Sequence, residues 1–160
     1  MKDDCYRAVH RLLRKCEYDK VLKLIYDREN HSLNEPYSDD SNHGWYIVGD
    51  ICFKKSDYKL AIKAFKNALT QRKDDSEALM ALANCYAEIG KPQKAERYLR
   101  ESIRIKPLKA YVYNLANALF DQGKFRDAIE MYEAILYQNK QLDDLARKNL
   151  KLAKKKRGKA

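Results

Sequence analysis

Histidine is the side chain of this sequence best suited to bind a metal ion or transfer a proton near neutral pH. His31 and His43 lie on either side of Asp39 and Asp40, and imidazole and carboxylate groups together form many metal sites. The four residues fall in a segment with the composition of a loop. We interpret them as solvated loop residues, with metal binding as the minor alternative.

Cysteine is the candidate nucleophile, but a thiol needs a base beside it to act as one, and the sequence suggests none. The cysteines form no C-x-x-C pair, and no glycine-rich phosphate loop is present. We therefore predict reduced thiols that pack as small apolar side chains, in a protein that is not an enzyme and holds no metal or cofactor. The four residues concerned are Cys5, Cys16, Cys52 and Cys85.

The composition is typical of a folded domain, because 45% of the 160 residues are apolar and 35% are charged. No stretch approaches the roughly 18–20 apolar residues that a membrane helix needs. The first residues include two acids and lack the apolar segment of a secretory signal. We expect a cytoplasmic protein without a membrane span.

Positive charge is concentrated near the C-terminus. From Arg147 onward there are eight lysines or arginines and no acid, in a chain whose formal net charge is +10. Residues 30–50 instead contain four acids and no lysine or arginine. A basic cluster of this kind predicts binding to nucleic acid or to an anionic surface, although a solvated helix end has the same composition. The cluster, here called the basic tail, comprises Lys154, Lys155, Lys156 and Arg157.

Small residues recur at a nearly constant spacing, which indicates a structural repeat. Ala61, Ala95 and Ala128 are 34 and 33 residues apart, and a turn former precedes each by five positions. Upstream of each alanine, apolar residues at i, i+3, i+4 and i+7 predict an amphipathic helix. Each repeat is therefore expected to be a pair of helices in close contact. The turn formers are Ser56, Gly90 and Gly123, and the small residues expected at the contact are Gly49, Ala83 and Ala116.

These residues resemble the tetratricopeptide repeat (TPR) family, with copies at 42–75, 76–108 and 109–140. The resemblance implies an all-α, right-handed solenoid of helical hairpins and a function in protein–protein interaction. The first copy carries Trp45, Gly49, Tyr58, Ala61, Phe65 and Ala68.

Both ends of the repeat array depart from this pattern, as terminal repeats do. Residues 1–41 are interpreted as a degenerate helical hairpin followed by an acidic loop around Pro36. Residues 141–160 are expected to form a basic C-terminal capping helix and tail. The buried stripe expected for that helix comprises Leu142, Leu145, Ala146, Leu150 and Ala153.

The resemblance also implies a binding groove along the first helix of each repeat, at its positions 2, 5, 9 and 12. Asparagine there can offer a donor and an acceptor to a peptide backbone, and aromatic rings offer apolar walls. The groove residues expected are Tyr46, Asp50 and Phe53 in the first repeat, Met80 and Asn84 in the second, and Tyr113, Asn117 and Phe120 in the third, with Tyr6 and His10 as an extension. In full, the four positions hold His43, Tyr46, Asp50 and Phe53, then Glu77, Met80, Asn84 and Ala87, then Ala110, Tyr113, Asn117 and Phe120.

The predicted function is that of an adaptor or assembly scaffold that binds a protein or peptide in this groove. The alternatives are binding through the convex face, nucleic-acid binding through the basic tail, a role as a small secretion-type chaperone, and formation of a homo-oligomer through the ends of the array. A clamp for a C-terminal carboxylate is not expected. The positions that form such a clamp in the family hold Tyr46, Asp50, Ala81, Ala110 and Asn114 here, so the basic residues that would pair with the carboxylate are missing.

Overall fold

The computed structural model describes residues 2–136 and 140–159, which contain nine α-helices and one pair of two-residue strands. The predicted all-α helical repeat is confirmed. The chain divides into two compact units, an N-terminal unit (Met1–Lys73) and a C-terminal unit (Asp74–Ala160). None of the helices in the described residues is long and apolar enough to cross a membrane.

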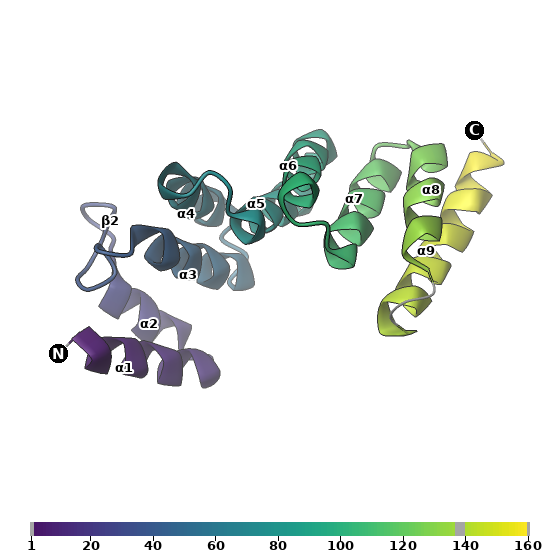
Figure 1. The fold of residues 1–160 in the computed structure, drawn as a ribbon. Coiled ribbons are helices and arrows are strands. Elements are labelled where there is room, and N and C mark those ends of the chain that lie inside the picture. The colour runs from purple at the N-terminus through teal and green to yellow at the C-terminus, as the bar shows by residue number, and fades with distance from the viewer. Residues whose placement is uncertain (1, 137–139, 160) are drawn as a thin grey trace. The chain divides into compact units, whose positions relative to one another are not determined.

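The N-terminal unit contains two helical hairpins (Figure 1). Helices α1 and α2 form the first and pack against each other; α3 and α4 form the second. Between the hairpins lie strands β1 and β2, which pair antiparallel with Tyr26 opposite Leu33. The bounds are α1 (Lys2–Arg14), α2 (Tyr18–Ile25), β1 (Tyr26–Asp27), β2 (Ser32–Leu33), α3 (Ser41–Lys54) and α4 (Tyr58–Gln71).

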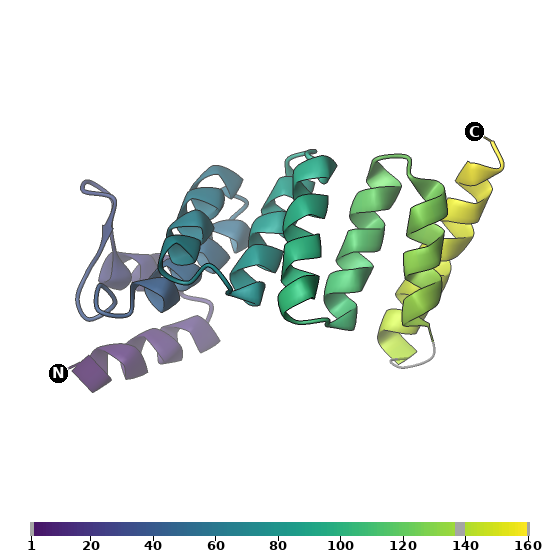
Figure 2. The same ribbon diagram turned by 45° about the horizontal axis from the view of Figure 1, so that its top comes forward.

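The C-terminal unit consists of five helices, each packed against the next along the chain. Helices α7, α8 and α9 lie side by side in both ribbon views (Figure 2). First helices of successive pairs also touch, since α7 contacts both α5 and α9. The bounds are α5 (Ser76–Glu88), α6 (Pro92–Ile105), α7 (Lys109–Asp121), α8 (Phe125–Ile135) and α9 (Lys140–Arg157).

The same turn closes all four hairpins. Its central residue has a positive φ, and two backbone N–H groups bond back to carbonyls three and five residues earlier. In the third hairpin, for example, Gly90 donates to Ala87 and Lys91 donates to Tyr86. This pattern caps the carbonyls at the end of the first helix. The central residues are Cys16 (φ 56°), Ser56 (60°), Gly90 (69°) and Gly123 (76°).

Small residues lie where the paired helices meet, as predicted. A Cβ atom added to Gly49 would lie 2.7 Å from the Phe65 ring, so α3 and α4 approach too closely for any side chain there. The alanines of the other close contacts are fully buried, with Ala83 and Ala116 in first helices and Ala61, Ala95 and Ala128 in second helices.

The acidic segment is more ordered than the expected loop. Residues 26–33 form the β-pair, and Tyr37 is among the largest of the fully buried side chains. Its ring contacts the Tyr6 ring edge-on, with centroids 4.8 Å apart. The Asp40 side chain then accepts a hydrogen bond from the His43 backbone N–H and begins α3. The segment between the two hairpins therefore contributes to the core.

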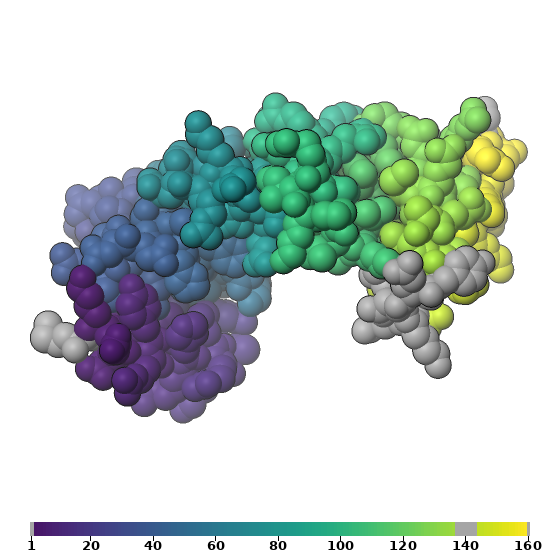
Figure 3. All heavy atoms as spheres, viewed as in Figure 1, coloured from purple at the N-terminus to yellow at the C-terminus, as the bar shows by residue number. Residues whose placement is uncertain are grey.

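Helix α9 packs on α8, and the two also lie against each other in the space-filling view (Figure 3). Its buried stripe is narrower than expected: Ala146 and Ala153 are fully buried, whereas Leu145 is 47% exposed and Leu150 is half-buried. The alanines allow a close approach to α8 that leaves the longer side chain at the margin. The side chain of Leu142 lies outside the described residues.

Candidate functional site

The predicted groove aromatics also pack inside their own hairpins. The Tyr46 ring contacts the Phe65 ring at 5.6 Å, and the Phe53 ring contacts that of Tyr58 at 5.6 Å. The third repeat shows the same two contacts, between Tyr113 and Tyr132 at 6.0 Å and between Phe120 and Phe125 at 5.3 Å. Each first-helix ring is half-buried. One side of each ring is thus held by its hairpin, and the other remains accessible.

The asparagines of the C-terminal unit form hydrogen bonds between first helices. Asn114 Nδ2 of α7 donates to Asn84 Oδ1 of α5 at 3.1 Å. Asn84 Nδ2 in turn contacts Met80 Sδ at 3.1 Å. Asn84 therefore fixes the register of α5 and α7, and its carbonyl oxygen is already used within the protein.

Asn117 lies at the centre of a second polar cluster. Its Oδ1 accepts hydrogen bonds from the Tyr132 hydroxyl at 2.6 Å and from Asn149 Nδ2 of α9 at 3.1 Å. Asn149 Nδ2 also donates to the Tyr113 hydroxyl at 3.0 Å. Tyr132 is 1% exposed, and burial raises its pKa well above the ordinary value. Within the described residues, the Asn117 amide N–H groups are left to serve as donors.

The structure places the remaining predicted groove residues in the N-terminal unit. The Asp50 carboxylate pairs with Lys54 at 2.7 Å. The Tyr6 hydroxyl donates to the Pro36 carbonyl at 3.2 Å, so this side chain holds α1 against the turn between β2 and α3. His10 is exposed and lines an open cleft of about 630 Å³ on α1, together with Arg7 and Arg11.

The candidate metal ligands have other contacts. His31 Nδ1 hydrogen-bonds the Tyr26 hydroxyl at 2.8 Å, and the His43 ring stacks on Tyr37 inside α3 rather than in a loop. Asp39 pairs with Lys2. No cluster of three or more potential metal ligands is present in the described part of the chain.

None of the four cysteines, all of which lie in the described residues, forms a disulfide. Cys52 and Cys85 are buried at packing positions, and burial raises the pKa of Cys52 to about 11. At neutral pH that thiol is therefore protonated and a poor nucleophile.

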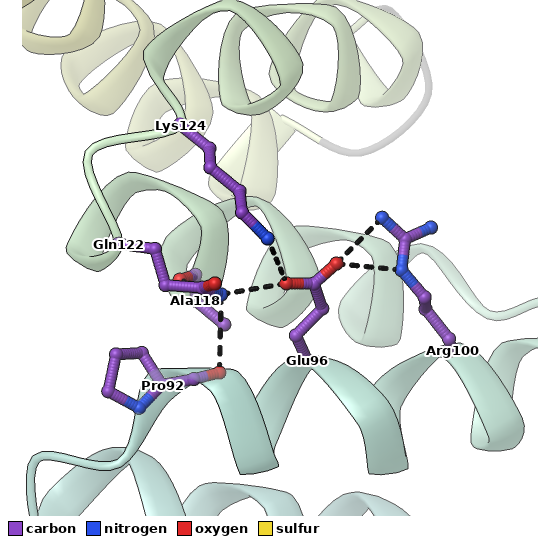
Figure 4. Close-up of polar contacts among 6 residues, drawn as sticks. All are labelled: Pro92, Glu96, Arg100, Ala118, Gln122 and Lys124. Carbon is purple, nitrogen blue, oxygen red and sulfur yellow. Dashed lines mark hydrogen bonds and ion pairs between the residues drawn. The ribbon is translucent and has the colours of Figure 1, made fainter.

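A cluster around Glu96 joins α6 to the turn between α7 and α8 (Figure 4). The carboxylate, 14% exposed, accepts hydrogen bonds from Arg100 Nε at 2.9 Å, Gln122 Nε2 at 2.8 Å and Lys124 Nζ at 2.8 Å. Desolvation works to raise its pKa, but these three partners outweigh it and lower the pKa to about 2. Sequence reasoning did not identify this cluster.

The basic tail is exposed along the end of α9. Lys154 pairs with Glu133 of α8 at 2.7 Å. Neighbouring cations extend into water beside it, with no acid after Asp144 to balance them.

Comparison with known sequences identifies one family. Two of its models, both described as Tetratricopeptide repeat, match residues 53–116 and 113–150. A Xenopus laevis protein named outer dynein arm-docking complex subunit 4 is 27% identical over 101 residues, which are 62% of this chain and 19% of that protein. The chain thus spans about a fifth of that relative.

Solved structures with the same fold include MamA, with a TM-score of 0.68 and 25% identity over 75% of this chain and 66% of that one. Another is the first TPR of Spaghetti (RPAP3) bound to the HSP90 peptide SRMEEVD. It has a TM-score of 0.66 and 18% identity, and the match covers 72% of this chain and 92% of that one.

Proposed function

Because the chain belongs to the tetratricopeptide repeat family, we propose that it is a non-enzymatic interaction module that binds a peptide along the first helices of its C-terminal unit. The groove surface is defined by Met80 of α5 and by Tyr113, Asn117 and Phe120 of α7. The observation that carries the proposal is their combination of partial exposure and fixed position. All four side chains are half-buried, and each contacts a neighbour that holds it in place.

This arrangement suits a peptide because little side-chain entropy remains to be lost on binding. The rings and the thioether provide apolar contact, while the Asn117 amide can donate to a carbonyl of the ligand backbone. That a domain of the same fold has been solved with a bound peptide supports the proposal. The positions of a carboxylate clamp hold Ala110 and Asn114 here, so we propose recognition of internal residues rather than of a chain end.

The test begins with selection of a random twelve-residue peptide display library against the full chain. Affinities of the selected peptides are then measured by fluorescence anisotropy for two matched pairs of variants. Met80→Ala on α5 is compared with Met131→Ala on α8, since both methionines are half-buried. Phe120→Ala is compared with Tyr98→Ala on α6, since both rings are half-buried.

The groove variants should weaken binding about five- to tenfold, which is the loss of roughly 1 kcal/mol of apolar contact. The two control variants on second helices, Met131→Ala and Tyr98→Ala, should remain within about twofold of the original chain. Equal losses in the members of each pair would show that stability, or another face, controls binding, and would refute the proposed groove.

A second candidate function is binding of nucleic acid or an anionic surface through the basic tail. It is favoured by the exposed cations that follow Asp144. Such binding should fall steeply with salt because it releases counterions, and it should vanish in a chain with Lys154, Lys155, Lys156 and Arg157 replaced by glutamine. Binding that persists at 0.5 M salt would contradict this second candidate.

A further inference from the structure

Helix α9 has the register of the first helix of a further repeat. Asn149 of α9 donates to Asn117 of α7 at 3.1 Å, just as Asn114 of α7 donates to Asn84 of α5 at 3.1 Å. The two donors are 35 residues apart in the sequence. The hydrogen bond between neighbouring first helices is therefore repeated, and α9 is the third helix of the series after α5 and α7.

Burial follows the same register. Three residues before each asparagine donor, Tyr111 of α7 and Ala146 of α9 are buried. Four residues after it, Ala118 and Ala153 are buried. The same face of each helix thus packs against the preceding hairpin, and the remaining faces can be aligned position by position.

This alignment puts a fourth row of side chains on the groove face. The row, here called the α9 row, stands 35 residues after the groove positions of α7 and is exposed throughout. Leu145 is 47% exposed and Leu152 is 44% exposed. In place of the rings of α7, this row presents leucine and lysine alternately. Its members are Leu145, Lys148, Leu152 and Lys155, which correspond to Ala110, Tyr113, Asn117 and Phe120.

The face of α9 that would meet a second helix differs from that of the other repeats. In α5 the corresponding residues are Leu79, Leu82 and Tyr86, all of them buried. In α9 they are Arg147, Leu150 and Lys154. Charged residues at two of these positions oppose the docking of another apolar helix there. Helix α9 therefore ends the packed array while continuing its groove face.

We propose that the α9 row is part of the binding surface and that its ligand is an acidic peptide carrying apolar side chains. This rests on the proposed groove and names the chemistry of its ligand. The two leucines, seven residues apart, lie about 10 Å apart along one side of the helix and provide the apolar contact. Lys148 lies between the two leucines and Lys155 follows Leu152, and both complement carboxylates of the ligand. A second copy presenting the same basic row would be repelled by like charge.

The display selection described above tests this chemistry directly. Peptides selected by the full chain should carry more Asp and Glu than the input library, together with apolar residues. The same selection is then performed on the full chain with Lys148→Glu and Lys155→Glu. Its control carries Lys63→Glu and Lys66→Glu on α4, where both lysines are exposed and the change in net charge is identical.

The acidic enrichment should disappear with the α9 variant and persist with the α4 control. Affinity of the selected peptides should fall about tenfold in the α9 variant, and about fivefold in a chain with Leu145→Gln and Leu152→Gln. Ile89→Gln, at another exposed apolar side chain, should have no effect. Far-UV circular dichroism confirms that each variant remains helical.

Selected peptides without acidic enrichment would overturn the inference, and so would equal losses in the α9 variant and the α4 control. If only oligonucleotides or anionic vesicles bind the α9 row, the inference also fails, in favour of the second candidate function. Failure of the groove proposal is recognised separately, because binding would then be insensitive to Met80→Ala and Phe120→Ala.

Discussion

Glu96 offers a quantitative test of how the C-terminal unit is held together. Its carboxylate accepts hydrogen bonds from Arg100 on its own helix and from Gln122 and Lys124 at the next hairpin turn. Replacing Glu96 by glutamine keeps the size of the side chain and removes its charge. Lys124 then loses its partner, and the contact between α6 and the α7–α8 turn weakens.

The size of the effect follows from the pKa. A fall from 4.5 to about 2 corresponds to about 3 kcal/mol of stabilisation at neutral pH. Because glutamine retains an acceptor, we expect Glu96→Gln to lower the free energy of unfolding by about 2 kcal/mol at pH 7. A carboxylate with a lowered pKa contributes its full stability above the unfolded value near 4.5. That contribution is lost as the pH falls through 2, so the difference between the original chain and the variant should shrink towards zero between pH 4.5 and pH 2.

The assay is urea unfolding of the full chain and the variant, followed by circular dichroism at pH 7, 4.5, 3 and 2. The matched control is Glu101→Gln, an exposed glutamate on the same helix, which should change stability by less than about 0.5 kcal/mol. Two results would refute the reasoning. One is an equal loss in Glu96→Gln and Glu101→Gln; the other is a Glu96→Gln loss that does not depend on pH.

Three further substitutions test the packing and the turns by urea unfolding. Gly49→Ala should destabilise the protein by about 1–3 kcal/mol, because the new methyl group would lie 2.7 Å from the Phe65 ring; an increase in stability would contradict the close contact. Ser56→Gly should stabilise by about 0.5–1 kcal/mol, since Ser56 has a φ of 60°, and a loss would contradict the left-handed turn. Asn117→Leu should cost about 2–3 kcal/mol, because it leaves the buried Tyr132 hydroxyl without its acceptor; a neutral result would remove Asn117 from the polar cluster.

The repeated elements could be predicted because their signal is local. Small residues such as Gly49 and Ala61 mark helix contacts wherever the spacing is constant, and the helices occur where the periodicity of apolar residues indicates them. A glycine five positions before Ala95 or Ala128 likewise predicts a left-handed turn. Cys16 forms the same left-handed turn, but cysteine is not a turn-forming residue, so the local sequence does not predict it.

The rest depends on contacts between distant residues. The acidic composition of residues 30–50 predicts a loop and gives no indication that Tyr37 is buried. The aromatic neighbours of Tyr37 lie on α1 and α3. The Glu96 cluster combines residues more than 20 positions apart. In α9, the expected buried stripe is right at Ala146 and Ala153 but wrong at Leu145, because the close approach of α8 favours alanine at the buried positions. The register of Asn149 becomes visible only through its bond to Asn117.

The central claim is that a peptide binds along the first helices of the C-terminal unit. Methyl NMR of the full chain labelled at its methionines tests it most directly, because Met80 lies on α5 and Met131 lies on α8. On titration with a selected acidic peptide, the Met80 methyl signal should shift in proportion to occupancy while the Met131 signal stays in place. A shift at Met131 with Met80 unchanged would place the ligand on the second helices and contradict the proposed groove.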